Sequence, residues 1–178
     1  YYIFCDIVTE GTIKKNLRKD FNFFEQLFLN QIPYAIFIEK NIWLLNNGYD
    51  ENMKLGYEDW EFNIRLGSNN IFGKRLPLPL FHYSINSSGM LISKSSKYHA
   101  QIWRYIKNKH SELYEPMNIL KSWSLWRKKE SSYPLLIFFA WYLSFKILPN
   151  RISSKLFLMF RNFKWLFTRN SLFNQNKL

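Results

Sequence analysis

Residues 48–62 read GYDENMKLGYEDWEF, and they repeat a glycine, a tyrosine and an acid before they place Glu58 directly beside Asp59. Adjacent carboxylates repel each other, so such a pair needs either a solvated helix start or a use for two acids. The first interpretation is structural, because Asp is a favoured N-cap and negative charge suits a helix N-terminus. The second is chemical, because a carboxylate that faces a cleft can accept a proton from a hydroxyl group.

The pattern on either side of this segment predicts an α/β fold. Residues 1–8 are an apolar, β-rich run, and the turn at Glu10-Gly11 predicts a hairpin. Two further strands are expected, one over 35–38 and a proline-containing edge strand over 70–85. Mixed strands and helices of this kind predict a sheet covered by helices.

The helices are predicted from apolar residues at helical spacing. A short helix is expected over 22–30, a helical turn through Trp43 that stops at Asn46-Asn47-Gly48, and a helix over 59–68. This last helix would begin at Asp59, turn Trp60, Ile64, Phe62 and Leu66 inward and end at Gly67. A polar, amphipathic surface helix is expected over 95–114, with His99 and His110 in solvent.

The charge of the chain is unevenly distributed. The net charge is +12, and residues 121–178 carry 11 Lys and Arg against one acid, whereas residues 1–120 carry 14 against 12. We therefore expect two parts, a nearly neutral domain over 1–115 and a basic, aromatic, amphipathic helical tail over 116–178. The single cysteine, Cys5, excludes a disulfide within the chain.

The order of these segments resembles the acceptor-side half of family 2 glycosyltransferases of the GT-A fold. The resemblance rests on GYDE at 48–51, GYEDWE at 56–61, Arg65-Leu66 and the strand end LFHY at 80–83. It covers about residues 1–115 and implies a partial GT-A (Rossmann-like) domain with a mixed sheet. The implied activity is that of an inverting hexosyltransferase, which moves a sugar from a nucleotide-sugar donor to a surface glycan or a lipid-linked acceptor.

The resemblance also implies roles for the residues of the segment. Asp59 would be the catalytic base that deprotonates the acceptor hydroxyl, and Glu58 would hold the acceptor sugar by hydrogen bonds. Trp60 would either stack on a sugar face or pack in the core. Gly48 and Gly56 suit positions where the backbone approaches the acceptor or takes a positive φ.

Charged residues outside the acid pair receive separate expectations. Asp50 is expected to organise its loop, and Arg65 to pair with a carboxylate rather than contact a diphosphate. His82 is a candidate metal ligand, because a histidine near this position completes the metal site of some relatives. The alternative for His82 is an ordinary polar strand residue.

Two departures from the family pattern concern the donor side. Ser84 follows Tyr83 where the family usually has arginine, and no Asp-x-Asp motif occurs in the sequence. That motif grips the divalent metal, Mn²⁺ or Mg²⁺, and through it the diphosphate of the donor. We therefore expect the donor-binding half and the main metal ligands to be absent from this chain. The alternative function is a non-catalytic, membrane-peripheral remnant or partner subunit with the same acceptor-side fold.

The tail contains two apolar stretches. Residues 134–149 hold 14 residues between two prolines, and a helix of that length is about 21 Å long, shorter than the hydrocarbon core of about 30 Å. An interfacial helix is therefore expected rather than a spanning one. On a helix over 151–169, one arc would gather Ile152, Leu156, Met159, Phe160, Phe163, Leu166 and Phe167.

Cations flank that arc, which is typical of a helix lying in an anionic membrane interface. We expect contact with a membrane surface through 134–169, on the cytoplasmic side of the plasma membrane. The alternative is that the arc packs on the first domain. No nucleic-acid partner is expected, because the cations frame an apolar face rather than a groove. Residues 101–105, QIWRY, partly match a polymer-binding motif of processive relatives, but their periodicity favours an ordinary helix.

Overall fold

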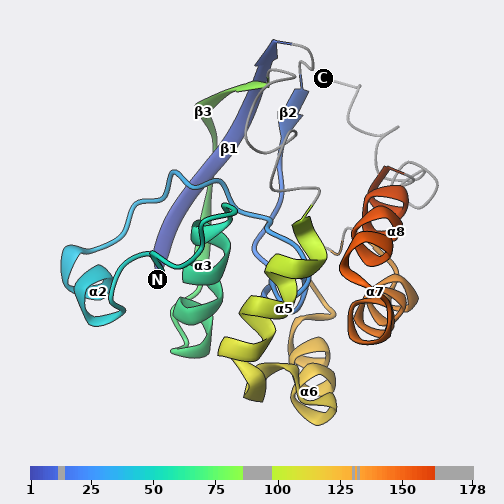
Figure 1. Ribbon diagram of the computed structural model, residues 1–178. Helices are drawn as coiled ribbons and strands as arrows, with labels where there is room; N and C mark the ends of the chain where they lie inside the picture. The colour runs from blue at the N-terminus through green and yellow to red at the C-terminus, as the bar shows by residue number, and fades with distance from the viewer. Residues whose placement is uncertain (12–14, 86–97, 130, 132, 163–178) are drawn as a thin grey trace.

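A small mixed sheet lies at the centre of the fold (Figure 1). The computed structural model describes residues 1–11, 15–85, 98–129, 131 and 133–162. In chain order these residues form β1 Tyr2–Gly11, β2 Lys15–Leu17, α1 Phe23–Gln26, α2 Lys40–Leu45, α3 Glu58–Ser68, β3 Gly73–Ile85, α5 His99–Lys109, the 3₁₀ helix η2 Ser111–Tyr114, α6 Pro116–Trp126, α7 Leu135–Ile147 and α8 Asn150–Asn162. The chain is therefore α/β, as the sequence predicts.

The described sheet has the strand order β2-β1-β3, in which β1 is antiparallel to β2 and parallel to β3. The hairpin and the edge position of the third strand are thus confirmed. The register between β1 and β3 is interrupted, because Cys5 pairs with Leu76 whereas Ile7 pairs with Phe81. Pro77 and Pro79 fall in this interruption. Proline has no N–H to donate to a ladder, so both prolines are accommodated there at little cost.

One face of β1 and the helices enclose an aromatic core. Tyr2 and Phe4 are buried on that face, and Asp6 beside them pairs with Arg75 of β3 through bonds of 2.6 and 2.8 Å. From α3, Trp60, Phe62, Ile64 and Leu66 are all buried, as their spacing predicts. The short helix α1 packs against both α3 and α6, so the core continues from the sheet into the tail.

Two of the expected elements differ from the structure. Residues 35–38 do not form a strand, because only the single bridge between Phe37 and Ile3 is made, and the side chain of Phe37 is 84% exposed. The chain enters α2 at Lys40, so little extended backbone remains to pair. The helix expected over 22–30 is also shorter, since α1 covers only Phe23–Gln26, with Asn22 as its N-cap.

The ends of α3 differ from the prediction as well. The helix begins at Glu58, and its N-cap is Tyr57 with φ 66°, so Asp59 is not the capping residue. Gly67 does not end the helix, which continues to Ser68. A Cβ at Gly67 would lie 2.1 Å from a ring carbon of Phe23. This glycine therefore permits close packing of α3 against α1 rather than a helix stop.

The surface helix expected over 95–114 is more deeply buried than its composition suggests. Within α5, Ile102, Trp103 and Ile106 are buried. The prediction that His99 is solvated is wrong, because its ring stacks on Phe157 of α8 at 3.5 Å. The charged and polar side chains that made this helix look solvated lie on its opposite face.

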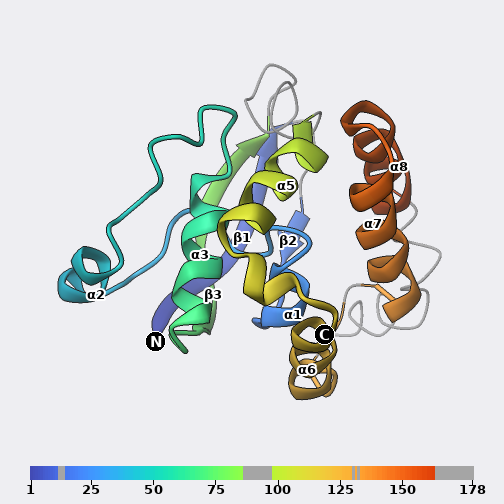
Figure 2. The same cartoon turned by 60° about the horizontal axis from the view of Figure 1, so that its bottom comes forward.

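The tail helices pack against the rest of the fold, with α7 and α8 side by side (Figure 2). Arg104 of α5 donates to the carbonyl oxygens of Phe145, at 2.6 Å, and of Leu148, so its guanidinium caps the C-terminus of α7. These contacts support the ordinary-helix interpretation of residues 101–105. They also occupy the one arginine of the polymer-binding motif.

The helix expected over 151–169 is described only as far as Asn162, and its remaining residues lie outside the described part of the chain. Its core-facing side is formed by Ser153, Ser154 and Phe157, which are buried. Ile152 and Met159 from the expected apolar arc are exposed. Part of α8 thus packs on the domain while an adjoining apolar strip faces outward. Within the described ranges, no helix has the length and hydropathy needed to cross a bilayer.

Candidate functional site

The acid pair lies at the N-terminus of α3, directly after a tight turn. Gly56 has φ 91° and Tyr57 has φ 66°, so two consecutive residues adopt the left-handed region. A positive φ in a non-glycine residue such as Tyr57 is uncommon and is often found at functional sites. Gly48 also has a positive φ, 54°, so the positive φ expected of both glycines is confirmed. This turn leads directly into α3 and places Glu58 and Asp59 in the first turn of that helix.

Both carboxylate oxygens of Asp59 accept hydrogen bonds. Oδ2 accepts from Nδ2 of Asn30 at 2.8 Å, and Oδ1 accepts from the backbone N–H of Trp60 at 2.9 Å. Asn30 follows α1, so the acid is held between the start of α3 and the end of the preceding helical segment. No pattern in the sequence points to Asn30, because a polar residue after a short apolar helix is common.

The environment of Asp59 perturbs its titration. The pKa of Asp59 is raised to about 6, chiefly by burial and also by the neighbouring charge of Glu58, while the hydrogen bond from Asn30 opposes the rise. Burial penalises the ionised form of a carboxyl, and a like charge nearby adds to that penalty. At neutral pH Asp59 is therefore an ionised carboxylate that takes up a proton more readily than an ordinary aspartate.

Tyr49 is a third polar residue beside the pair. Burial raises the pKa of its hydroxyl, and the charges of Asp59 and Glu58 contribute in the same direction. Its ring lies edge-on to Trp43 at 4.6 Å and to Phe62 at 5.4 Å. Tyr49 has no role predicted from the sequence, because nothing in the spacing connects it to Asp59.

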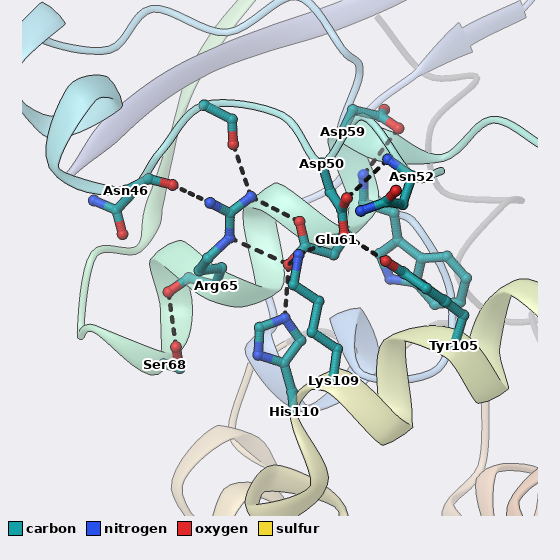
Figure 3. Close-up of polar contacts among 12 residues, drawn as sticks. Asn46, Asp50, Asn52, Asp59, Glu61, Arg65, Ser68, Tyr105, Lys109 and His110 are labelled. Carbon is teal, nitrogen blue, oxygen red and sulfur yellow. Dashed lines mark hydrogen bonds and ion pairs between the residues drawn. The ribbon is translucent and has the colours of Figure 1, made fainter. Parts of the chain in front are cut away.

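A buried ionic network supports the site from the far side of α3 (Figure 3). Glu61 is 0% exposed and accepts from Arg65 at 2.7 Å, from Lys109 at 3.0 Å and from His110 at 2.8 Å. Burial alone would raise the pKa of Glu61, but the bonds from His110, Arg65 and Lys109 outweigh it and lower that pKa to about 2. The contact with Glu61 also shows that His110 is not free in solvent, contrary to the prediction.

The same network fixes the loop that precedes the acid pair. Arg65 donates to the carbonyl oxygens of Asn46 and, at 2.7 Å, of Gly48, so it clamps the turn after α2. Asp50 accepts from Lys109 at 2.6 Å and from Tyr105 at 2.8 Å (Figure 3). The expected structural roles of Arg65 and Asp50 are both confirmed. Residues 46–50 are therefore tied to α3 and α5 rather than left as an independent loop.

Two of the residues assigned from the resemblance are placed differently. Trp60 is 0% exposed, and its indole N–H donates to the carbonyl of Gln26 at 2.6 Å, so it is a core residue with no face for a sugar. His82 is 61% exposed and contacts Glu10 at 2.6 Å on the distant sheet. Among the described residues, no three histidine, cysteine or acidic side chains lie together as a metal site would require.

Comparison of the chain with protein families, with curated proteins and with solved structures finds no match. The chemistry of the site therefore rests on its own geometry. That geometry brings Asn30, Glu58 and Asp59 together, with Tyr49 within electrostatic reach of both acids. Trp60 lies in the core, and His82 contacts Glu10 instead. A carboxylate with a raised pKa, held by an amide and flanked by a second acid, is equipped to accept a proton from a bound hydroxyl group.

Proposed function

We propose that the chain is the acceptor-side half of an inverting glycosyltransferase in which Asp59 is the catalytic base. The observation that carries this proposal is the partly buried Asp59 carboxyl, bonded to Asn30 and with a pKa raised to about 6. A general base works best when its pKa lies near the operating pH. In the proposed reaction Asp59 takes the proton of an acceptor hydroxyl while that oxygen displaces the nucleotide at the anomeric carbon of the donor sugar.

The neighbours of Asp59 have roles that fit the same step. Glu58 would hold the acceptor sugar by accepting hydrogen bonds from its hydroxyl groups. Gly56 carries no side chain, which would let a substrate approach the backbone of the turn. Tyr49 would supply one more hydroxyl beside the acceptor. The Glu61 network fixes the positions of these groups relative to one another, because it ties the Gly48 turn to α3.

The donor is proposed to be a nucleotide sugar bound with Mn²⁺ or Mg²⁺. The sequence contains no Asp-x-Asp, so the proposal places the principal metal ligands outside this chain and assigns no step to them. The acceptor is proposed to be a surface glycan or a lipid-linked sugar. The proposal supposes a GT-A arrangement, of which the described three-stranded sheet and its covering helices would be one half.

We further propose that the chain acts at the cytoplasmic face of a plasma membrane. Leu136, Leu143 and Ile147 of α7 are exposed, with Leu136 78% exposed. Exposed lysines and arginines accompany them on α6 to α8, including Lys121, Lys146, Arg151 and Lys155. Exposed apolar side chains framed by cations suit an anionic lipid surface.

The test is a transfer assay on the full-length natural protein that contains this chain. The assay uses a panel of UDP- and GDP-sugars with Mg²⁺ or Mn²⁺, and membrane lipid extract as the acceptor. Asp59→Asn should reduce kcat by about 100-fold or more, because a positioned base contributes that much. Donor binding should be unchanged. The matched control is Glu51→Gln, an exposed acid of the same segment. Asp59→Asn with wild-type kcat would overturn the assignment.

A second candidate is a non-catalytic partner subunit that keeps the acceptor-side fold. The observation in its favour is the absence of Asp-x-Asp from the sequence. Calorimetric titration of the full-length natural protein that contains this chain with UDP- and GDP-sugars in Mn²⁺ separates the two candidates. Binding of a donor supports the enzyme, whereas no binding of any donor supports the partner subunit.

A further inference from the structure

An apolar pocket of about 280 Å³ lies between α1, α6 and α7, outside the candidate site. Its floor is aromatic and includes Phe24, Phe28 and Phe138, of which Phe28 and Phe138 are each 1% exposed. Its mouth is formed by Leu120, Phe139 and Leu143, which are exposed. The pocket therefore leads from the surface of the tail helices into the core.

The side chains that line the pocket present no free hydrogen-bonding group to a polar ligand. Every residue that lines the pocket is aliphatic or aromatic, and the hydroxyl of Tyr142, the polar group among them, donates to the carbonyl of Tyr114 at 3.2 Å. Water in such a space would find no partners, and apolar cavities of this kind stay dry and accept hydrocarbons. The volume lies at the lower end of the range for ligand pockets, which suits one chain rather than a whole lipid.

The surroundings of the mouth indicate where that chain comes from. Phe139 and Leu143 at the mouth belong to one exposed stripe of α7 that also contains Leu136 and Ile147, at helical spacings of three and four. Exposed cations lie on the same helices, and residues 121–178 carry 11 Lys and Arg against one acid. The apolar stripe and the positive charge together match an anionic bilayer surface.

We propose that this pocket takes one hydrocarbon chain of an anionic membrane lipid. The stripe on α7 would lie at the level of the headgroups, and the chain would leave the bilayer between α6 and α7 to pack on Phe28 and Phe138. This inference rests on the membrane contact proposed above, but it does not depend on sugar transfer. It explains why a core otherwise closed by aromatic rings stays open on the side of the exposed stripe.

The experiment uses phosphatidylcholine vesicles that contain phosphatidylglycerol with a diazirine at the end of one acyl chain. After irradiation, the labelled residues of the protein are mapped by mass spectrometry. We expect label on the floor, at Phe28 or Phe138, as well as on the exposed stripe. Label confined to the stripe would overturn the pocket while the membrane contact stands. Failure of the protein to sediment with these vesicles would overturn both.

Variants make the result specific. Leu143→Trp and Leu120→Trp block the mouth from two different helices, and either should lower floor labelling about tenfold because several methylenes lose their apolar site. Leu136→Trp is the matched control, since it enlarges the stripe without entering the pocket. All three should still sediment with vesicles. Unchanged floor labelling in both blocking variants, with unchanged thermal unfolding, would overturn the inference.

Discussion

The side-chain amide of Asn30 donates a hydrogen bond of 2.8 Å to Oδ2 of Asp59, across 29 positions of sequence. This bond favours the ionised form of Asp59, whereas burial and the charge of Glu58 oppose it. The carboxyl of Asp59 is therefore ionised at neutral pH, but its ionised form is less favoured than that of an ordinary aspartate, so it accepts a proton more readily. Such opposed contributions are typical of acids that take part in proton transfer.

Replacement of Asp59 by asparagine should stabilise the fold at neutral pH. The pKa of Asp59 in the folded protein, about 6, is raised above the ordinary value of 3.8. The stability that the protonated acid contributes is therefore fully present below about pH 3.8 and is lost as the pH rises through about 6. Asp59→Asn avoids that loss, so its free energy of unfolding should exceed that of the wild type by up to about 3 kcal/mol at about pH 8. Denaturant unfolding at several pH values checks this, and a gain that does not shrink toward about pH 4 would contradict it.

Removal of the amide donor should raise the pKa of Asp59 further. In Asn30→Ala the carboxylate keeps its burial and the neighbouring Glu58 but loses the bond that favours its ionised form. Titration of the Asp59 carboxyl by carbon NMR should therefore give a pKa above that of the wild type. Asn52→Ala is the control, since Asn52 contacts Asp50 through its backbone N–H. A lower pKa in Asn30→Ala would refute the assigned role of Asn30.

Apolar periodicity predicted the parts of the fold that follow local rules. The inward residues of α3, the hairpin of β1 and the edge position of β3 follow from spacing, turn residues and prolines. The strand over 35–38 was wrong because strand formation depends on a partner, and only Phe37 meets one. His99 was placed in solvent because its helix is polar overall, although Phe157, 58 positions later, covers it.

The candidate site was only partly predictable for the same reason. The acid pair and the two glycines lie within one short segment, so a local pattern identified them. Asn30, Lys109 and His110 come from other parts of the chain, and no spacing rule connects them to α3. Trp60 shows the limit of a local rule, because its place in the helix allowed either a sugar contact or the core, and packing against α1 decides for the core.

Substitution of Glu61 should destabilise the fold strongly, in contrast to Asp59. Glu61→Gln leaves Arg65, Lys109 and His110 without their shared carboxylate. Since these three side chains are partly exposed, we expect a loss of about 2–3 kcal/mol in the free energy of unfolding at about pH 7. The folded pKa of Glu61, about 2, lies below the ordinary 4.5, so its contribution is present above 4.5 and is lost as the pH falls through 2.

Thermal and denaturant unfolding across pH measure this loss. The gap between Glu61→Gln and the wild type should narrow as the pH falls below about 4. Glu51→Gln is the control, because an exposed acid should change stability by no more than about 0.5 kcal/mol. A Glu61→Gln variant as stable as the control would mean that the buried network contributes nothing to the fold.

The glycine within α3 gives the last prediction. Alanine normally stabilises a helix interior relative to glycine by about 1 kcal/mol. At Gly67, however, a Cβ would lie 2.1 Å from Cε2 of Phe23, and the buried ring has little room to move. Gly67→Ala should therefore destabilise by about 1–3 kcal/mol, as overpacking does. If the clash is the cause, Phe23→Leu should relieve it, so the double variant should lose less than the sum of the single losses. If the two losses of stability are additive, or if Gly67→Ala is more stable than the wild type, α1 must shift to admit the methyl group. In that case Asn30, four residues beyond α1, is not held rigidly against Asp59.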